Sequence, residues 1–163
     1  MAGWRWIPTP GHSPGHVSFF READRTLIVG DAFVTTKQES AIAALSQRPE
    51  LHGPPSYFTP DWEAAGRSVE RLAALEPLRV ITGHGPPMQG ERMLNGLHDL
   101  ARNFERLAVP SHGRYVGEPA VTDETGVVAV PPPVPDPLPR IALGVGVGLL
   151  LTAAFRKARR PAG

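Results

Sequence analysis

Three short motifs constrain the fold of this chain more than any other feature, because each follows a stretch of apolar, β-branched residues. In chain order they are Thr-Pro-Gly-His-Ser-Pro-Gly-His at residues 9–16, Gly30-Asp31, and Gly83-His84-Gly85. The preceding stretches are predicted to be strands, at residues 4–7, 26–29 and 78–81. A rigid strand that gives way to a loop can aim a side chain. Three separate strand ends are therefore predicted to converge on one point.

The side chains at these strand ends are metal donors. His12, Asp31 and His84 supply two imidazoles and a carboxylate, which are donor types of hydrolytic metal centres. His16 is expected to stand behind them, hydrogen-bonded to a ligand rather than bound to metal itself. Each position also has a plainer interpretation, since Gly-His-Gly is often a turn and Asp31 could cap a turn or helix. The three motifs together favour a metal site.

These motifs resemble those of the metallo-β-lactamase-fold hydrolases, a superfamily that includes glyoxalase II-like thioesterases, lactonases and ribonuclease Z-like nucleases. The run containing His12 is similar to the third metal motif of that family, Gly30-Asp31 to the motif whose carboxylate bridges two ions, and Gly83-His84-Gly85 to the last metal motif. The resemblance covers residues 4–107. It implies an α/β (α+β) fold, the C-terminal half of an αββα metallo-β-lactamase-type sandwich, with one or two divalent ions, expected to be zinc.

One part of the family pattern does not occur in these 163 residues, namely the opening His-x-His-x-Asp-His. The resemblance then implies that each metal keeps one histidine, His12 or His84, and a share of Asp31. Catalytic zinc generally has three protein ligands, so weak metal affinity is expected unless another polypeptide supplies the rest. Because the alternation of Trp4 and Trp6 with Arg5 starts almost at residue 1, we expect a chain truncated at its N-terminus.

A missing first sheet would leave the second sheet covered on one face only. The strand candidates then include apolar side chains with no partner layer, such as Trp6, Phe19 and Ile81, and an exposed apolar patch is expected. We therefore expect the isolated chain to be marginally folded, to self-associate, or to pair with a missing N-terminal half.

Composition narrows the functional classes. The chain has no cysteine, which excludes disulfides and thiolate ligands and favours a site of His and Asp. Its net charge of +1 gives no basic footprint for nucleic acid, so a small-molecule substrate is expected instead.

Helices are predicted between and after the strands. Residues 37–47 suit a short helix and residues 51–60 a proline-rich loop. Thr59 is expected to cap a second helix with Pro60 in its first turn, and a third helix is predicted over residues 93–107 from its apolar spacing. Residues 17–20 and 26–29 are predicted to pair as a hairpin.

The chain divides into three predicted regions. Residues 1–109 form the partial metallo-β-lactamase-like domain, residues 110–140 an extended Pro-rich linker with a strand candidate at 127–130, and residues 141–163 an apolar helix with a basic tail. As a helix, residues 141–155 would be short for a membrane span, at roughly 22 Å against roughly 30 Å, yet a transmembrane helix is favoured over a peripheral hairpin or a disordered tail. No signal peptide is recognisable, so a cytoplasmic or membrane-associated protein is expected.

The resemblance implies metal-assisted hydrolysis, with His12, Asp31 and His84 as ligands and His16 behind them. An ester or thioester substrate is favoured over nucleic acid, although this fold hosts several hydrolytic reactions. Whether the chain is an enzyme stays open at this point. The alternative is a non-catalytic, membrane-attached remnant that acts as an interaction module.

Overall fold

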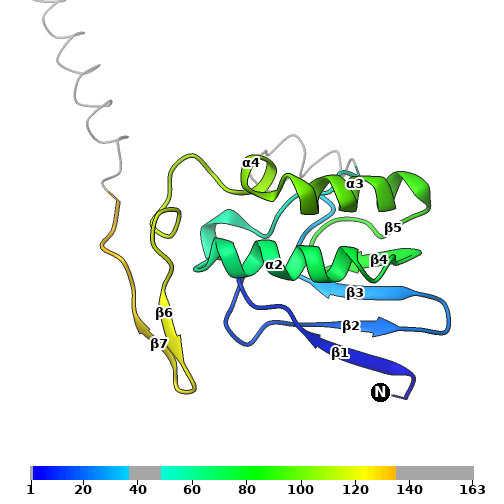
Figure 1. The fold of residues 1–163 in the computed structure, drawn as a ribbon, viewed down its shortest axis with the longest axis horizontal. Helices are drawn as coiled ribbons and strands as arrows, with labels where there is room; N and C mark the ends of the chain where they lie inside the picture. Colours follow the sequence, from blue (N-terminus) through cyan, green and yellow to red (C-terminus); the bar gives the residue numbers. More distant parts are fainter. Residues whose placement is uncertain (1, 37–48, 135–163) are drawn as a thin grey trace, which may run out of the picture. The chain divides into compact units, whose positions relative to one another are not determined.

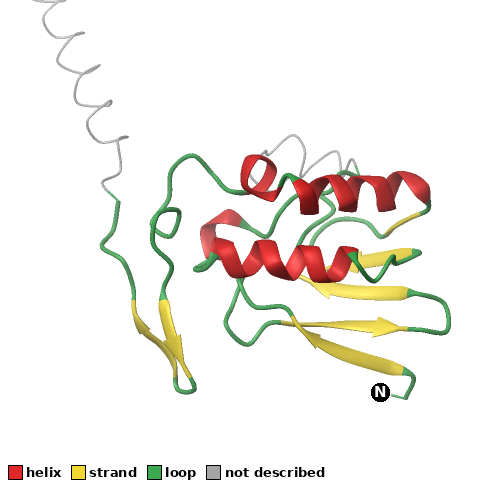
Figure 2. Cartoon of the chain, in the orientation of Figure 1, coloured by secondary structure: helices red, strands yellow, loops and turns green. Residues whose placement is uncertain are grey.

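The computed structural model describes residues 2–36 and 49–134, and its main feature is a five-stranded sheet in the order β1-β2-β3-β4-β5 (Figures 1 and 2). The first three strands form an antiparallel meander, β4 runs parallel to β3, and β5 is antiparallel to β4. The strands are β1 Trp4–Pro8, β2 Val17–Arg21, β3 Thr26–Gly30, β4 Arg79–Thr82 and β5 Met88–Gln89. The predicted hairpin and the three strands before the motifs are confirmed, and the α/β fold class with them.

Helices α2 and α3 lie on one face of this sheet (Figure 1). Between β3 and β4 the chain passes through the short 3-10 helix η1, Ser56–Phe58, and through α2, Trp62–Ala73. After β5 follow α3, Glu91–Arg102, and α4, Phe104–Ala108. The single helix predicted over residues 93–107 is therefore two helices, which break at Asn103.

The cap of α2 differs from the prediction. Asp61, not Thr59, is the N-cap, and its Oδ1 accepts the N–H of Ala64 at 2.8 Å. A side-chain acceptor there satisfies one of the N–H groups that a helix leaves unpaired at its start. Thr59 is fully buried and donates instead to the carbonyl of Pro55 at 2.8 Å.

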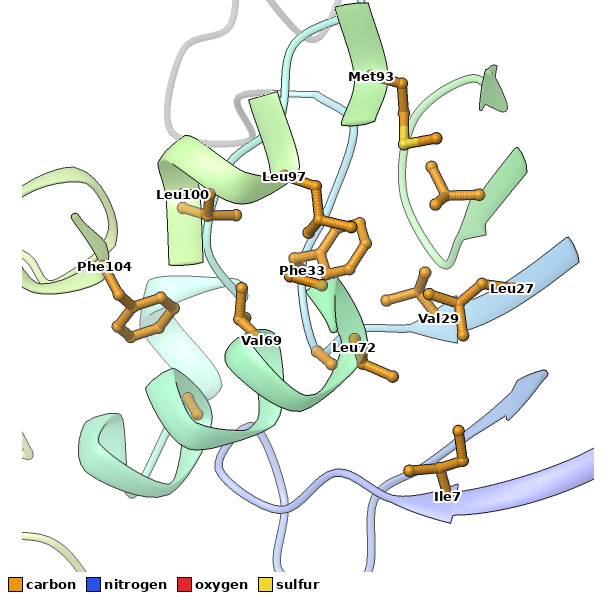
Figure 3. Packing of buried hydrophobic residues seen from close by; sticks show 14 of the residues in the cluster. Ile7, Leu27, Val29, Phe33, Val69, Leu72, Met93, Leu97, Leu100 and Phe104 are labelled. Carbon is orange, nitrogen blue, oxygen red and sulfur yellow. The ribbon is translucent and has the colours of Figure 1, made fainter. Parts of the chain in front are cut away.

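The hydrophobic core fills the space between the sheet and the helices (Figure 3). The sheet contributes Leu27 and Val80 among others, and Phe33 packs between them and the helices. Helix α2 contributes Val69 and Leu72, a spacing that keeps both on one helical face. Fully burying an aliphatic or aromatic side chain of this size stabilises a fold by about 1.5–3 kcal/mol. This one-sided core fixes the strand ends that carry the motifs.

The opposite face of the sheet carries an apolar row that crosses four strands. Trp6 pairs with Phe19, Phe19 with Ile28, and Ile28 with Ile81. Their sequence neighbours, such as Leu27 and Val80, are wholly buried against the helices, so alternation places the row on the other face. Trp6 is 61% exposed and Ile81 37% exposed. The exposed apolar patch expected from the sequence is confirmed, and we call these four residues the open-face row.

Residues 1–132 form one compact unit, which includes a second, two-stranded sheet. It consists of β6, Val121–Asp123, and β7, Gly126–Ala129, so the strand candidate near residue 127 is confirmed. The predicted helix at residues 37–47 and the apolar segment at 141–163 lie outside the described residues. Within the described ranges, no helix has the length and apolar character needed to cross a membrane.

Candidate metal centre

The three predicted donors come together at one edge of the sheet, with Asp31 in the middle. Asp31 Oδ2 lies 3.7 Å from His12 Nε2, and Asp31 Oδ1 lies 3.6 Å from His84 Nε2. His12 comes from the loop after β1, Asp31 directly follows β3, and His84 follows β4. Because β3 and β4 are parallel neighbours, their C-terminal ends meet at the same edge. Each carboxylate oxygen thus faces the imidazole of a different histidine.

The Asp31 carboxylate leaves an acceptor unused. Its Oδ1 is buried and has no hydrogen-bond partner among the described residues. A buried, unpaired carboxylate oxygen is costly unless a cation or a donor compensates it. Two imidazoles and one carboxylate suit a divalent metal in kind. In arrangement they fall short, because within residues 2–36 and 49–134 no group of three or more His, Asp or Glu side chains is placed so that it could hold an ion.

His12 is held from its other ring nitrogen. Its Nδ1 lies 3.5 Å from the hydroxyl of Thr59, in the loop before α2. Burial lowers the pKa of the His12 imidazole, and nearby His84 lowers it further, while the charge of Asp31 acts in the opposite direction. The neutral imidazole, which is the form that binds metal, is favoured as a result.

His16 supports Asp31 through the main chain. Its Nε2 accepts the backbone N–H of Asp31 at 2.9 Å, so the proton of the neutral ring sits on Nδ1. Burial lowers the pKa of His16, and the neighbouring His12 adds to this effect. His16 therefore touches a candidate ligand from behind, although its role as a supporting residue stays a prediction.

A buried chain of hydroxyls continues from His16 into the sheet. His16 Nδ1 lies 2.8 Å from Thr9 Oγ1, Thr9 Oγ1 lies 3.0 Å from Ser18 Oγ, and Ser18 donates to the carbonyl of Val29 at 2.8 Å. Since the Ser18 proton is directed at Val29, Thr9 donates to Ser18 and His16 donates to Thr9. We call these three residues, Thr9, His16 and Ser18, the histidine relay. Sequence patterns assigned no role to Thr9, although it begins the first motif, or to Ser18, because their hydroxyls matter only through this tertiary arrangement.

The main chain at His84 is held by two threonines. The carbonyl of His84 accepts the backbone N–H of Thr35 at 3.1 Å and the hydroxyl of Thr82 at 2.8 Å. The Thr35 hydroxyl in turn donates to the carbonyl of Pro86 at 2.7 Å. The side chain of His84 is about half exposed, so its main chain is fixed while its ring remains accessible.

Three glycines of the motifs are required by close packing, two of them beside Asp31 and His16. A Cβ on Gly83 would collide with the Asp31 carboxylate, and a Cβ on Gly30 would come within 2.6 Å of His16 Nε2. Gly30 also has a φ of +65°, a left-handed conformation that disfavours side chains. Gly11 has no room either, because its Cβ would meet the backbone of Ala65 in α2. The sequence marked these glycines as turn residues, and their close approach to the donors became visible only in the fold.

The remaining histidines lie apart from this cluster. His98 Nε2 pairs with Glu76 at 2.8 Å, and His52 Nε2 lies 3.5 Å from Glu50. His112 is exposed and its ring contacts the hydroxyl of Ser111. None of the three is predicted from the sequence to take part in the metal site.

Comparison with known proteins gives a consistent family. The model of the metallo-beta-lactamase superfamily matches residues 1–84. The chain is 50% identical over 104 residues to the probable metallo-hydrolase YflN of Bacillus subtilis (strain 168), which covers 64% of this chain and 39% of that protein. It is 35% identical over 81 residues to the probable metallo-hydrolase YybB of the same organism, covering 50% of this chain and 32% of the relative. The chain thus spans well under half the length of these relatives.

Two solved structures contain segments similar to part of this chain. The metallo-beta-lactamase family protein TTHA1429 from Thermus thermophilus is 24% identical with a TM-score of 0.41, over 63% of this chain and 30% of that one. TTHA1623 in a di-iron-bound form is 28% identical with a TM-score of 0.41, over 63% of this chain and 41% of that one.

Proposed function

The chain belongs to the metallo-beta-lactamase superfamily, and we propose that it contributes part of the active site of a metal-dependent hydrolase. The observation that carries this proposal is the carboxylate of Asp31, which faces His12 with one oxygen and His84 with the other. The unpaired, buried Oδ1 supports it, because a cation would satisfy that atom.

Zinc is the metal proposed for these donors. Imidazole and carboxylate ligands suit Zn²⁺, although iron also uses them. His12, Asp31 and His84 would hold the ion or ions. When bound, a divalent ion supplies Lewis-acid activation of water and of the scissile carbonyl or phosphoryl group.

The residues behind the donors hold them in place. His16 fixes the main chain of Asp31, and Thr35 and Thr82 fix the main chain of His84. Such supporting bonds restrict ligand positions before any metal arrives, which raises affinity. Further ligands are proposed to come from polypeptide outside these 163 residues, since the chain spans only 39% of the relative YflN. The same polypeptide, or a second copy of this chain, would cover the open-face row.

An ester or thioester is the proposed substrate. A hydrolytic metal centre acts on several classes of bond, and fold alone does not choose among them. The net charge of +1 argues against a nucleic-acid substrate, whose backbone is recognised through clustered basic residues.

Zinc titration of the full chain tests the metal site. We expect uptake that His12→Ala, Asp31→Ala and His84→Ala each weaken at least tenfold, while His98→Ala leaves it unchanged. His98 is a matched control because it is also a histidine facing a carboxylate, but on the helical side of the molecule. Equal uptake by wild type and the Asp31→Ala variant would refute the proposed site. No uptake by wild type would favour the non-catalytic interaction module.

A further inference from the structure

A second feature of the molecule is a cavity of about 710 Å³ beside the loop that precedes α2. Its volume lies within the usual range for small-molecule sites. The walls come from residues 52–57, from Trp62 at the start of α2, from the end of α4 and from residues 109–116. None of the donors of the candidate metal centre lines it.

The lining of this cavity is aromatic and basic. Tyr57, Trp62 and Tyr115 contribute ring surfaces, and Arg114 contributes a permanent positive charge. None of the described residues that line it is Asp or Glu. Glu50 approaches the lining residue His52 at 3.5 Å but does not itself form part of the wall.

Arg114 is held in position at the wall. Its Nε donates to the carbonyl of Pro131 at 2.6 Å, and its guanidinium carbon lies 5.8 Å from the ring centre of Tyr115. That hydrogen bond uses one of the five N–H donors of a guanidinium group. An arginine restrained in this way is suited to bind a carboxylate through two parallel hydrogen bonds.

The cavity is linked to the candidate metal centre by shared loops. Ser56 and Tyr57 line the cavity, and Thr59, two residues further on, contacts His12. The backbone of His52 pairs with that of Val34, in the segment that follows Asp31. A ligand in the cavity would therefore contact the same loop that supports one metal donor.

We propose that this cavity binds the carboxylate-bearing, aromatic or apolar part of the substrate, with Arg114 as its anchor. The identification of the ligand as a substrate rests on the proposed hydrolase function. Its binding in the cavity does not require metal. Trp62 and Tyr57 contact the apolar body, and the guanidinium group of Arg114 pairs with the carboxylate. The site would thereby select anionic substrates over neutral ones.

Binding of phenylacetate to the full chain, without metal, tests this assignment. We expect phenylacetate to bind at least tenfold more tightly than its neutral analogue phenylacetamide, and to shift the NMR signals of the Trp62 indole and the Thr59 amide. Arg114→Gln should lose at least tenfold in phenylacetate affinity, and Arg114→Lys should lose less. Arg92→Gln, an exposed arginine on α3 that does not line this cavity, should bind as wild type does.

Several outcomes would overturn the assignment. Equal binding of acid and amide would do so, as would an Arg114→Gln variant that binds like wild type. Tighter binding of phenyl phosphate than of phenylacetate would overturn the choice of a carboxylate. Parallel measurements on Asp31→Ala separate the two proposals, because that variant should lose zinc uptake and keep phenylacetate binding. If the wild-type chain binds phenylacetate but no zinc, the proposed hydrolase function is refuted and the cavity site is still supported.

Discussion

Removing one hydroxyl from the histidine relay is predicted to destabilise the protein far more than its size suggests. Ser18→Ala deletes a single buried hydroxyl, which donates to the carbonyl of Val29 at 2.8 Å and whose oxygen lies 3.0 Å from Thr9 Oγ1. Thr9 and Ser18 are both fully buried, so water cannot replace the lost partner. A buried polar group left unpaired costs roughly 1–3 kcal/mol. We expect a loss of about 2 kcal/mol in the free energy of unfolding.

Urea unfolding followed by circular dichroism measures this loss as a lower midpoint with an unchanged slope. Ser111→Ala is the matched control, since the Ser111 hydroxyl also has a hydrogen-bond partner, His112 Nδ1 at 2.8 Å, but is exposed. Exposed substitutions of this kind usually change stability by less than about 0.5 kcal/mol. If Ser18→Ala cost no more than Ser111→Ala, the relay would not be a structural element.

A double-mutant cycle tests whether the relay acts as a unit. Thr9→Val keeps the shape of the side chain and removes its hydroxyl, so in the double variant no Thr9 donor is left unpaired. The double variant should therefore lose less than the sum of the single losses, by about 1 kcal/mol. Nitrogen NMR should also show the proton of His16 on Nδ1, because Nε2 accepts from Asp31. Additive losses together with a proton on Nε2 would contradict the bonding order described above.

Three further predictions concern other parts of the molecule. Gly83→Ala should weaken zinc uptake roughly tenfold, because the new Cβ displaces the Asp31 carboxylate. Gly15→Ala is the control, since a Cβ there meets nothing within 4 Å. Equal zinc affinities of the two variants would contradict the packing argument. The hydrogen bonds from Arg21 hold the pKa of Asp24 well below its ordinary value. The stabilisation of the fold by the ionised Asp24 carboxylate is therefore present above about pH 4 and is lost as the pH falls further. Asp24→Asn should therefore lower the urea midpoint at pH 7 and do so less at pH 3, and an equal difference at both pH values would refute this. Trp6→Ser combined with Ile81→Ser should reduce self-association in sedimentation velocity, since both belong to the open-face row; unchanged sedimentation would show that this face does not mediate association.

The sequence was most informative where local pattern and tertiary structure agree. Strand β3 was predicted to within one residue, because its run of apolar and β-branched residues lies between a turn and a motif. The convergence of His12, Asp31 and His84 followed from their positions after strands, and the structure brings them together. Their role as metal ligands stays a prediction.

Other features could not be predicted because their causes lie far apart in the chain or are very short. Strand β5 has two residues, too few for a periodic pattern. The break between α3 and α4 comes from Asn103, whose side chain bonds back to Asp99, while the apolar spacing continues across it. Thr59 looked like a helix cap by residue type, but Asp61 was better placed.

His16 accepts a hydrogen bond from the backbone N–H of Asp31 and does not contact its carboxylate in this way. It therefore holds the main chain and leaves the candidate metal donor free. Any amino acid except proline presents the same N–H at that position, so this one hydrogen bond does not depend on which side chain residue 31 carries, whereas the close packing of Gly83 limits the size of that side chain. Under the proposed metal-binding role, another donor side chain no larger than aspartate could replace Asp31 while this main-chain bond is kept. Substitutions of this kind at residue 31 would test the donor and the backbone support separately.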